Sequence, residues 1–254
     1  MFDDPYDDLL PYYDSENADL SDDFPAYLHL AEEQDGPILD IGCGTGRVAF
    51  FLAAQAFKIT GIDRSEAMLG KAKTRSVHMP HGDQIVWHYA DMRALALESR
   101  FRLAIFSYNG FMHLLEQDEQ FALLDNIHKH LNSGGKLALD LINPLHFVQS
   151  DDLPGLSVER IFTDSATDEQ VIQQSLTRVD RVSQIVDITW IYDRIRIDRS
   201  VHREIIPVQL RYSFPSELRL LLQEAGFSEI ELYGDYDFTP YQEGSPRLFI
   251  VATQ

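Results

Sequence analysis

The feature that most constrains the fold is the run from Pro37 to Arg47, which reads PILDIGCGTGR. Residues 38–41 are apolar apart from Asp40, as expected for a strand buried in a parallel sheet. Three alternating glycines follow, and apolar residues at helical spacing resume at Val48. Glycine permits positive φ and a close approach to a ligand, and the first turn of a helix leaves N–H groups unpaired. The run therefore predicts a nucleotide-binding corner between a strand and a helix.

The stretch from residue 37 to 143 alternates expected strands with expected helices, which is typical of a doubly wound parallel α/β sheet. In such a sheet, ligands bind beyond the carboxyl ends of the strands. The residues that follow each strand are therefore the candidates for a site. We expect strands over 38–41, 57–63, 85–90, 102–107 and 135–142, and helices over 46–55, 65–75 and 117–131.

The glycine spacing is G-x-G-x-G, whereas dinucleotide sites carry G-x-G-x-x-G. Arg47 stands where the last glycine of that motif belongs, which disfavours NAD and FAD. Asp63 ends the expected second strand, and a carboxylate there suits the two hydroxyls of a ribose. Two alternatives stay open here, a nicotinamide-dependent oxidoreductase and a non-catalytic module that binds the nucleotide.

Two segments together, LDIGCGTGR and GIDRSEAML, resemble the first two motifs of class I S-adenosylmethionine-dependent methyltransferases. Further resemblance lies in the acid after the third strand, in LNSGGKLALDLINP and in SPRLFIVA near the C-terminus. The resemblance implies a mostly parallel, seven-stranded Rossmann-like sheet that ends in an antiparallel hairpin. It also implies S-adenosylmethionine as cofactor and S-adenosylhomocysteine as product. The cofactor site predicted on this basis comprises Asp40, Gly42, Gly44, Gly46, Arg47, Asp63, Arg64, Met68, Asp91, Met92 and Ser107.

Three of these residues have a specific expected role. In the family, the acid after the third strand receives the adenine amino group, which implies that role for Asp91, with Met92 beside the ring. A helix cap before Arg93 is the alternative for Asp91. Arg47 is expected at the methionyl carboxylate of the cofactor, and the alternative is that it pairs with neighbouring acids.

The segment after the expected fourth strand is where the methyl group and its acceptor should meet. His113 is the candidate general base, because its unperturbed pKa lies near neutrality, and packing against the next helix is its alternative role. Tyr108 is the second candidate catalytic residue. Neither Asn-Pro-Pro-Tyr nor an acid follows this strand, which argues against amide or nucleobase methylation and against a metal-dependent catechol type. No metal is therefore predicted. Substrate contacts are expected from Tyr6, Tyr13, Asn109 and Tyr241.

The remaining segments flank or interrupt this domain. Residues 1–36 are acidic and rich in tyrosine, with a helix expected over 24–33 and a loose segment before it, and we interpret them as an arm or lid. The main domain is expected over 37–143 and 207–254. Residues 144–206 lose helical periodicity and predict an inserted antiparallel sheet, which either roofs the substrate pocket or contacts a second copy of the chain.

The formal charge of -20 on 254 residues makes nucleic acid and anionic membranes unlikely partners, because like charges repel. The first residues show no basic, apolar leader and no apolar run is long enough to span a bilayer, so a cytoplasmic protein is expected. The sequence thus predicts an enzyme, monomeric or homodimeric, that methylates a small molecule at an amine nitrogen or else at oxygen.

Overall fold

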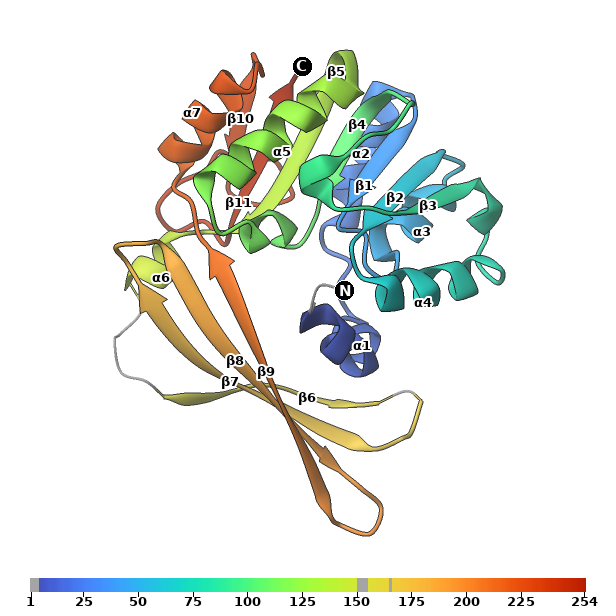
Figure 1. Cartoon of the computed structure of the whole chain (residues 1–254), viewed down its shortest axis with the longest axis vertical. Helices are drawn as coiled ribbons and strands as arrows, with labels where there is room; N and C mark the ends of the chain where they lie inside the picture. The colour runs from blue at the N-terminus through green and yellow to red at the C-terminus, as the bar shows by residue number, and fades with distance from the viewer. Residues whose placement is uncertain (1–4, 150–154, 165) are drawn as a thin grey trace.

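A computed structural model describes residues 5–149, 155–164 and 166–254, so the first four residues of the expected arm lie outside it. Two sheets organise these residues (Figure 1). The large sheet has the strand order β10-β11-β5-β4-β1-β2-β3, with β1 to β5 parallel and β11 antiparallel to its two neighbours. This confirms the predicted fold class. Its strands are β1 (Ile38–Ile41), β2 (Ile59–Asp63), β3 (Ile85–Tyr89), β4 (Phe101–Phe106), β5 (Leu131–Ile142), β10 (Ile230–Tyr233) and β11 (Arg247–Thr253).

Helices cover both faces of the large sheet, and each face has its own apolar core. One core joins the sheet to α2 (Phe24–Gln34) and α3 (Arg47–Ala53). The other joins it to α5 (Gln117–His130) and α7 (Pro215–Glu224). Helix α4 (Glu66–Ser76) contacts β2 and β3, and three short turns and one short helix complete this half, namely η1 (Gly82–Gln84), η2 (Met92–Ala94), η3 (Gly110–His113) and α6 (Leu145–Gln149). None of the helices in the described ranges is both long and apolar enough to cross a membrane.

The fifth strand begins earlier than expected. We expect a helix to end at residue 131 and the strand to begin at residue 135, yet β5 already starts at Leu131, directly after α5. The register between β4 and β5 shifts between Phe101 and Leu103, so the extra residues form an irregularity inside the pairing. The glycines of this segment therefore bend a strand, and do not separate it from the helix.

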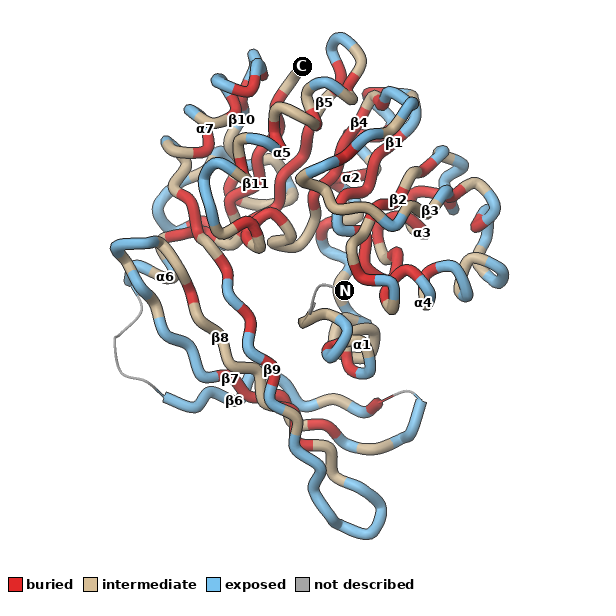
Figure 2. The backbone as a smooth tube through the Cα atoms, viewed as in Figure 1, coloured by how far each residue is buried: buried red, intermediate tan, exposed pale blue. Residues whose placement is uncertain are grey.

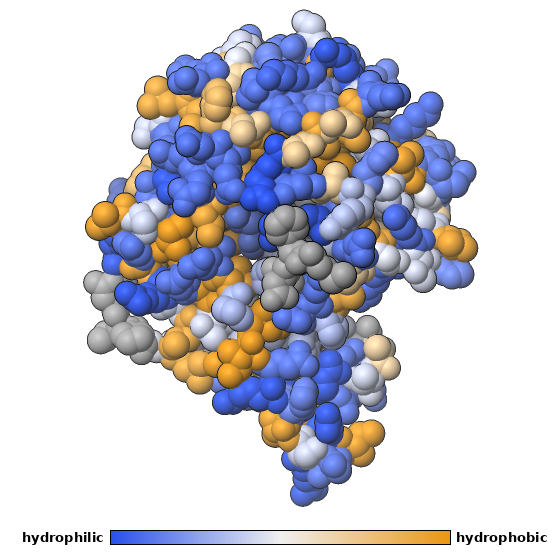
Figure 3. Space-filling model, viewed as in Figure 1, coloured by the Kyte–Doolittle hydropathy of each residue, from blue (hydrophilic) through white to orange (hydrophobic). Residues whose placement is uncertain are grey.

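The small sheet is an antiparallel meander of β6 (Leu156–Thr163), β7 (Gln170–Asp180), β8 (Ile185–Ile195) and β9 (Val201–Arg211). Strand β9 runs five residues past its expected end and includes Pro207, which an edge strand tolerates because its outer N–H groups are unpaired. One face packs on the core of the large sheet through Val186, Ile206 and Leu210. In Figure 2, buried and exposed residues alternate along the second half of β9, whereas β6 is mostly exposed. Apolar residues gather over this sheet in Figure 3.

The expectation of a loose segment before residue 24 is wrong, because residues 5–16 form helix α1 (Pro5–Glu16). Pro5 stands at the first helical position, where a missing N–H costs nothing, but Pro11 lies inside the helix. The helix persists because Tyr12 is fully buried and stacks on Tyr192 of β8, with ring centroids 4.2 Å apart. Tertiary packing thus outweighs a local helix breaker.

Helix α1 ties the two sheets together. At its end, Glu16 accepts hydrogen bonds from the Tyr192 hydroxyl at 2.8 Å and from Gln173 Nε2 at 2.7 Å, both in the small sheet. On the other side, Asp14 accepts a hydrogen bond from the Thr45 hydroxyl at 2.6 Å, in the glycine turn after β1. Figure 1 shows α1 between the small sheet and the lower edge of the large sheet.

Candidate active site

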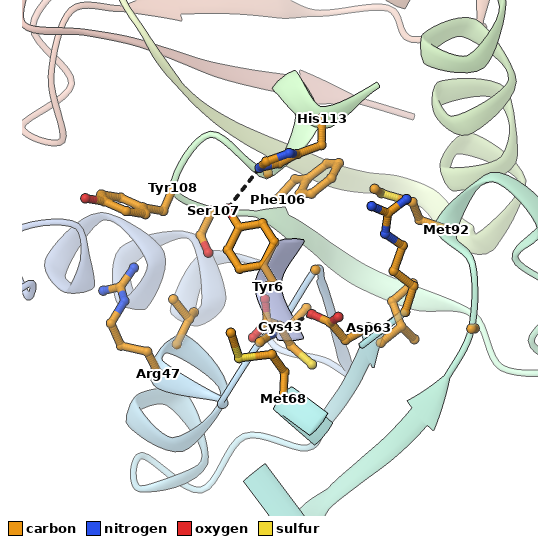
Figure 4. Close-up of a pocket in the computed structure, with 18 of the residues that line it drawn as sticks. Tyr6, Cys43, Arg47, Asp63, Met68, Met92, Phe106, Ser107, Tyr108 and His113 are labelled. Atoms are coloured by element: carbon orange, nitrogen blue, oxygen red, sulfur yellow. Dashed lines mark hydrogen bonds between the residues drawn. The ribbon is translucent and has the colours of Figure 1, made fainter. Parts of the chain in front are cut away.

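A pocket opens at the carboxyl ends of β1, β2 and β4, with residues of α1 on its other side (Figure 4). This is the edge at which a doubly wound sheet binds ligands. The predicted site residues that the structure brings together here are Tyr6, Tyr13, Asp40, Gly42, Gly44, Arg47, Asp63, Arg64, Met68, Met92, Ser107, Tyr108 and His113. Phe106 and Ala90 were not predicted, although both stand at or beside a strand end, where the same rule would have found them.

Asp63 fixes the geometry of the glycine turn. Its Oδ2 accepts a hydrogen bond from the Gly44 N–H at 2.7 Å, and its Oδ1 accepts one from the Ser65 N–H at 2.9 Å. Gly44 has φ +55, a conformation that side chains disfavour. One carboxylate therefore joins the turn after β1 to the start of α4 and faces the pocket.

Asp40 differs from Asp63 in having no partner. It is fully buried at the end of β1, and no described residue donates a hydrogen bond to either carboxylate oxygen. Burial raises the pKa of Asp40 from 3.8 to about 7. A buried carboxylate without partners is costly, and it lines the pocket. An ammonium group that entered the pocket would satisfy it.

Arg47 pairs with an acid of the N-terminal segment. Its Nη1 and Nη2 donate to the two carboxylate oxygens of Asp23 at 2.7 and 2.5 Å, and Nη1 also donates to the Leu20 carbonyl. Burial alone would lower the pKa of Arg47, but the hydrogen bonds that Arg47 donates to Asp23 outweigh it and raise that pKa. This is the pairing with neighbouring acids that the sequence left as an alternative, although the side chain still lines the pocket.

A tyrosine and a histidine meet across the pocket. The Tyr6 hydroxyl lies 2.9 Å from His113 Nε2, and the two rings pack edge to face with centroids 5.2 Å apart (Figure 4). Tyr6 comes from α1 and His113 from η3, so the pair forms only when α1 lies over the pocket. Tyr13 packs edge to face on Tyr6, and burial raises the pKa of Tyr13.

Four predicted site residues do not line the pocket. The first is Asp91, whose carboxylate caps η2 by accepting the Arg93 N–H at 2.9 Å and pairs with the Arg93 guanidinium at 2.6 Å. This geometry favours the helix-cap alternative, because Arg93 holds the carboxylate that should reach the ligand, and the adenine role of Asp91 stays a prediction. Hydrogen bonds donated by the Arg93 side chain lower the pKa of the Asp91 carboxyl below its ordinary value.

The second predicted site residue that does not line the pocket is Gly46. Its φ is +88, and a Cβ there would lie 2.6 Å from the Trp87 ring and 2.8 Å from the Phe50 ring. This glycine is therefore required by packing beneath the turn, and it makes no contact with the pocket.

The third and fourth residues that do not line the pocket are two expected substrate contacts, Asn109 and Tyr241. Asn109 turns its side-chain oxygen away from the pocket, toward the Ile142 N–H at 2.7 Å and Arg247 Nη2 at 3.0 Å. The Tyr241 hydroxyl donates to Asn143 Oδ1 at 2.7 Å. Both residues thus hold neighbouring strands and loops in place. In the described ranges, no group of three His, Cys, Asp or Glu side chains is placed to hold a metal ion.

Comparison with known proteins gives three kinds of match. A family profile described as a methyltransferase domain matches residues 38–135. The chain is 28% identical over 224 residues to the cypemycin N-terminal methyltransferase of a Streptomyces species, covering 84% of this chain and 81% of that protein. It is 26% identical over 226 residues to the glycine/sarcosine N-methyltransferase of Aphanothece halophytica, covering 87% and 77%. Its fold matches the solved structure of the CcbJ methyltransferase from Streptomyces caelestis, with a TM-score of 0.79, 25% identity, and coverage of 91% and 94%.

Proposed function

We propose that the chain is a class I S-adenosylmethionine-dependent methyltransferase and that it methylates an amine nitrogen of a small molecule. The observation that carries the proposal is the Tyr6–His113 hydrogen bond at the pocket, which can take up the proton that an acceptor releases, in an entrance rich in tyrosine. Two relatives support nitrogen, because one is named as an N-terminal methyltransferase of cypemycin and the other as a glycine/sarcosine N-methyltransferase. An acidic surface, at a net charge of -20, also attracts amines.

The pocket residues fit the cofactor group by group. Asp40 is a buried carboxylate without a partner, which suits the methionyl ammonium, and Asp63 suits the ribose hydroxyls. Met68 and Met92 offer adaptable apolar surface for the adenine. Ser107 remains for the methionyl carboxylate, because Asp23 already neutralises Arg47.

When bound, the cofactor supplies a methyl carbon on a positively charged sulfur: the acceptor nitrogen forms the N–C bond with its lone pair, the C–S bond breaks with its electrons staying on sulfur, and the nitrogen gives up one proton. Tyr6 accepts that proton on its oxygen while it passes its own proton to His113 Nε2, a relay that the 2.9 Å hydrogen bond prepares. The tyrosines of α1 exclude water and orient the acceptor. We assign residues 5–16 the role of lid and the small sheet that of roof, because the Tyr12–Tyr192 stack joins them.

The test is methyl transfer from labelled S-adenosylmethionine to a matched panel of acceptors. The panel holds glycine, amino sugars and peptides with a free N-terminus, each beside its hydroxyl counterpart. We expect label on amines and none on their hydroxyl counterparts. Transfer to hydroxyl compounds alone would overturn the nitrogen assignment.

The relay is tested by replacing each of its two residues. Tyr6→Phe and His113→Asn should each lower kcat about 100-fold or more, the usual contribution of a positioned acid or base. Tyr89→Phe is the matched control, because Tyr89 is 56% exposed and lies outside the pocket. Wild-type kcat in both pocket variants would remove the relay from the mechanism.

A further inference from the structure

We infer that Asp140 and Arg247 form a buried unit that positions Tyr108 for methyl transfer, an inference that rests on the proposed function. Neither residue lines the pocket, and no motif in the sequence points to either of them for catalysis. Tyr108 does line it, on the side opposite Met92 in Figure 4.

The turn that carries Tyr108 is conformationally costly. Tyr108 and Asn109 are consecutive and have φ of +46 and +65, in the left-handed region that residues other than glycine seldom occupy. Two such residues in sequence are unfavourable, so the surrounding structure must hold them there.

Asp140 holds this turn at two points. Its Oδ2 accepts the Tyr108 N–H at 2.9 Å, and its backbone carbonyl accepts the Asn109 N–H at 2.9 Å. Both donors are the backbone groups of the strained pair. Because Asp140 belongs to β5, in the middle of the large sheet, these two bonds fix the turn to a rigid element.

Arg247 of β11 closes the unit. Its Nε and Nη2 donate to Asp140 Oδ1 at 2.8 and 2.5 Å, and Nη2 also donates to Asn109 Oδ1 at 3.0 Å. The side chain of Asp140 is fully buried and that of Arg247 is 15% exposed. Charge-assisted hydrogen bonds in such surroundings are strong and directional. Tyr236 also donates to Asp140 Oδ2, at 3.0 Å, and this hydrogen bond meets the carboxylate and not the turn itself.

The hydrogen-bonding groups at position 140 fit a carboxylate and do not fit an amide. Every group around the Asp140 side chain is a donor: the Tyr108 N–H, the Tyr236 hydroxyl and the Arg247 guanidinium. In Asp140→Asn, the side-chain NH2 would face one of these donors and lose that bond. The turn then relaxes from its left-handed conformation, and the Tyr108 ring moves from the pocket.

A double-mutant cycle tests this coupling, with Asp140→Asn, Tyr108→Ala and the double variant. Each single variant should lower kcat about 10- to 100-fold, the scale of a small misplacement. Because Asp140 acts through Tyr108, Asp140→Asn should cause no further loss in the Tyr108→Ala background. Multiplicative losses, or wild-type kcat in Tyr108→Ala, would overturn the inference. Tyr89→Phe is the control and should stay within about twofold of wild type, because Tyr89 is 56% exposed and lies outside the pocket.

A second readout needs neither cofactor nor acceptor. A 3-fluorotyrosine at position 108 should give one sharp ¹⁹F resonance in the otherwise wild-type protein, and a shifted or split resonance after Asp140→Asn. An unchanged resonance would contradict positioning. Should Asp140→Asn fail to fold, Arg247→Lys replaces it in both experiments, since lysine keeps the charge but cannot bridge Asp140 and Asn109 as the fork does. The cycle is read with whichever acceptor the wild type methylates, so a failure of the nitrogen assignment leaves this test intact.

Discussion

At the scale of single residues, the pocket holds its two acids in opposite ways. Asp63 accepts two backbone hydrogen bonds, whereas Asp40 is fully buried and has none among the described residues. Burial raises the pKa of Asp40 to about 7, so this carboxyl is neutral in the empty pocket below that pH. The proposed ammonium contact requires the ionised form, because only that form attracts a cation.

The affinity for S-adenosylmethionine should therefore depend on pH. Between pH 5.5 and 7 the affinity should rise by up to about tenfold per unit, because each unit further ionises Asp40, and it should level off near neutrality. The raised pKa has the opposite effect on the empty protein: its folded state binds the proton more tightly, so this group's contribution to the free energy of unfolding falls between about pH 4 and 7.

Titration calorimetry at several pH values measures the binding effect. Asp40→Asn is the control, because it removes the titrating group and should give weaker binding that hardly changes over this range. A wild-type affinity that is equally flat would contradict the proposed contact of Asp40.

Asp63→Ala should weaken cofactor binding by roughly 1.5–3 kcal/mol, the scale of charge-assisted hydrogen bonds. Asp91→Ala is the matched control: its carboxylate faces Arg93, so the affinity should change by less than about 0.5 kcal/mol. Calorimetry with S-adenosylhomocysteine compares the two variants. Unchanged affinity in Asp63→Ala would remove it from the site, and a large loss in Asp91→Ala would restore its adenine role.

At this scale, the sequence predicted residue positions better than residue partners. The rule that ligands bind beyond strand ends correctly placed Asp40, Asp63 and Ser107 at the pocket. It could not show that Arg93, two residues after Asp91, would occupy that carboxylate, because a cap and a ligand contact use the same residue type at the same place.

At the scale of elements, two glycines of the turn between β1 and α3 are required for different physical reasons. Gly44 has φ +55, and the nearest atoms to a Cβ there would belong to the Tyr13 side chain, at an ordinary 3.7 Å or more. Gly46 has φ +88, and a Cβ would lie 2.6 Å from Trp87. Conformation alone restricts the first, whereas conformation and packing together restrict the second.

Gly46→Ala should therefore be the more destabilising change. We expect about 2–5 kcal/mol from backbone strain plus overpacking, against about 1–2 kcal/mol for Gly44→Ala from strain alone. Urea unfolding of both variants gives the two free energies. Equal losses, or a larger loss in Gly44→Ala, would contradict the packing role of Gly46.

The elements that the sequence predicted well are those with local signals. Apolar runs and helical periodicity marked the strands and helices of the large sheet, and alternation marked the small sheet. Helix α1 was not predicted, because its stability comes from packing on Tyr192, far along the chain. Locally, Pro11 indicates a break in the helix. The extension of β9 through Pro207 was missed for a related reason, since only the sheet order makes it an edge strand.

At the scale of the whole molecule, α1 joins the two sheets and contributes Tyr6 and Tyr13 to the pocket. If it is the lid, a bound ligand must stabilise its closed position, because binding draws on contacts that only the closed position provides. Hydrogen exchange should therefore slow across residues 5–16 when S-adenosylhomocysteine binds. The N–H groups of α7, remote from the pocket, serve as the internal control. Equal exchange in α1 with and without ligand would contradict the lid.

The proposed methyltransferase function depends on what occupies the pocket between the glycine turn and α1. A crystal structure with S-adenosylhomocysteine measures this directly. We predict the ribose against Asp63, the amino group against Asp40, and the sulfur facing Tyr6 and Tyr108. An empty pocket at saturating ligand, or a nucleoside bound elsewhere on the chain, would contradict the account.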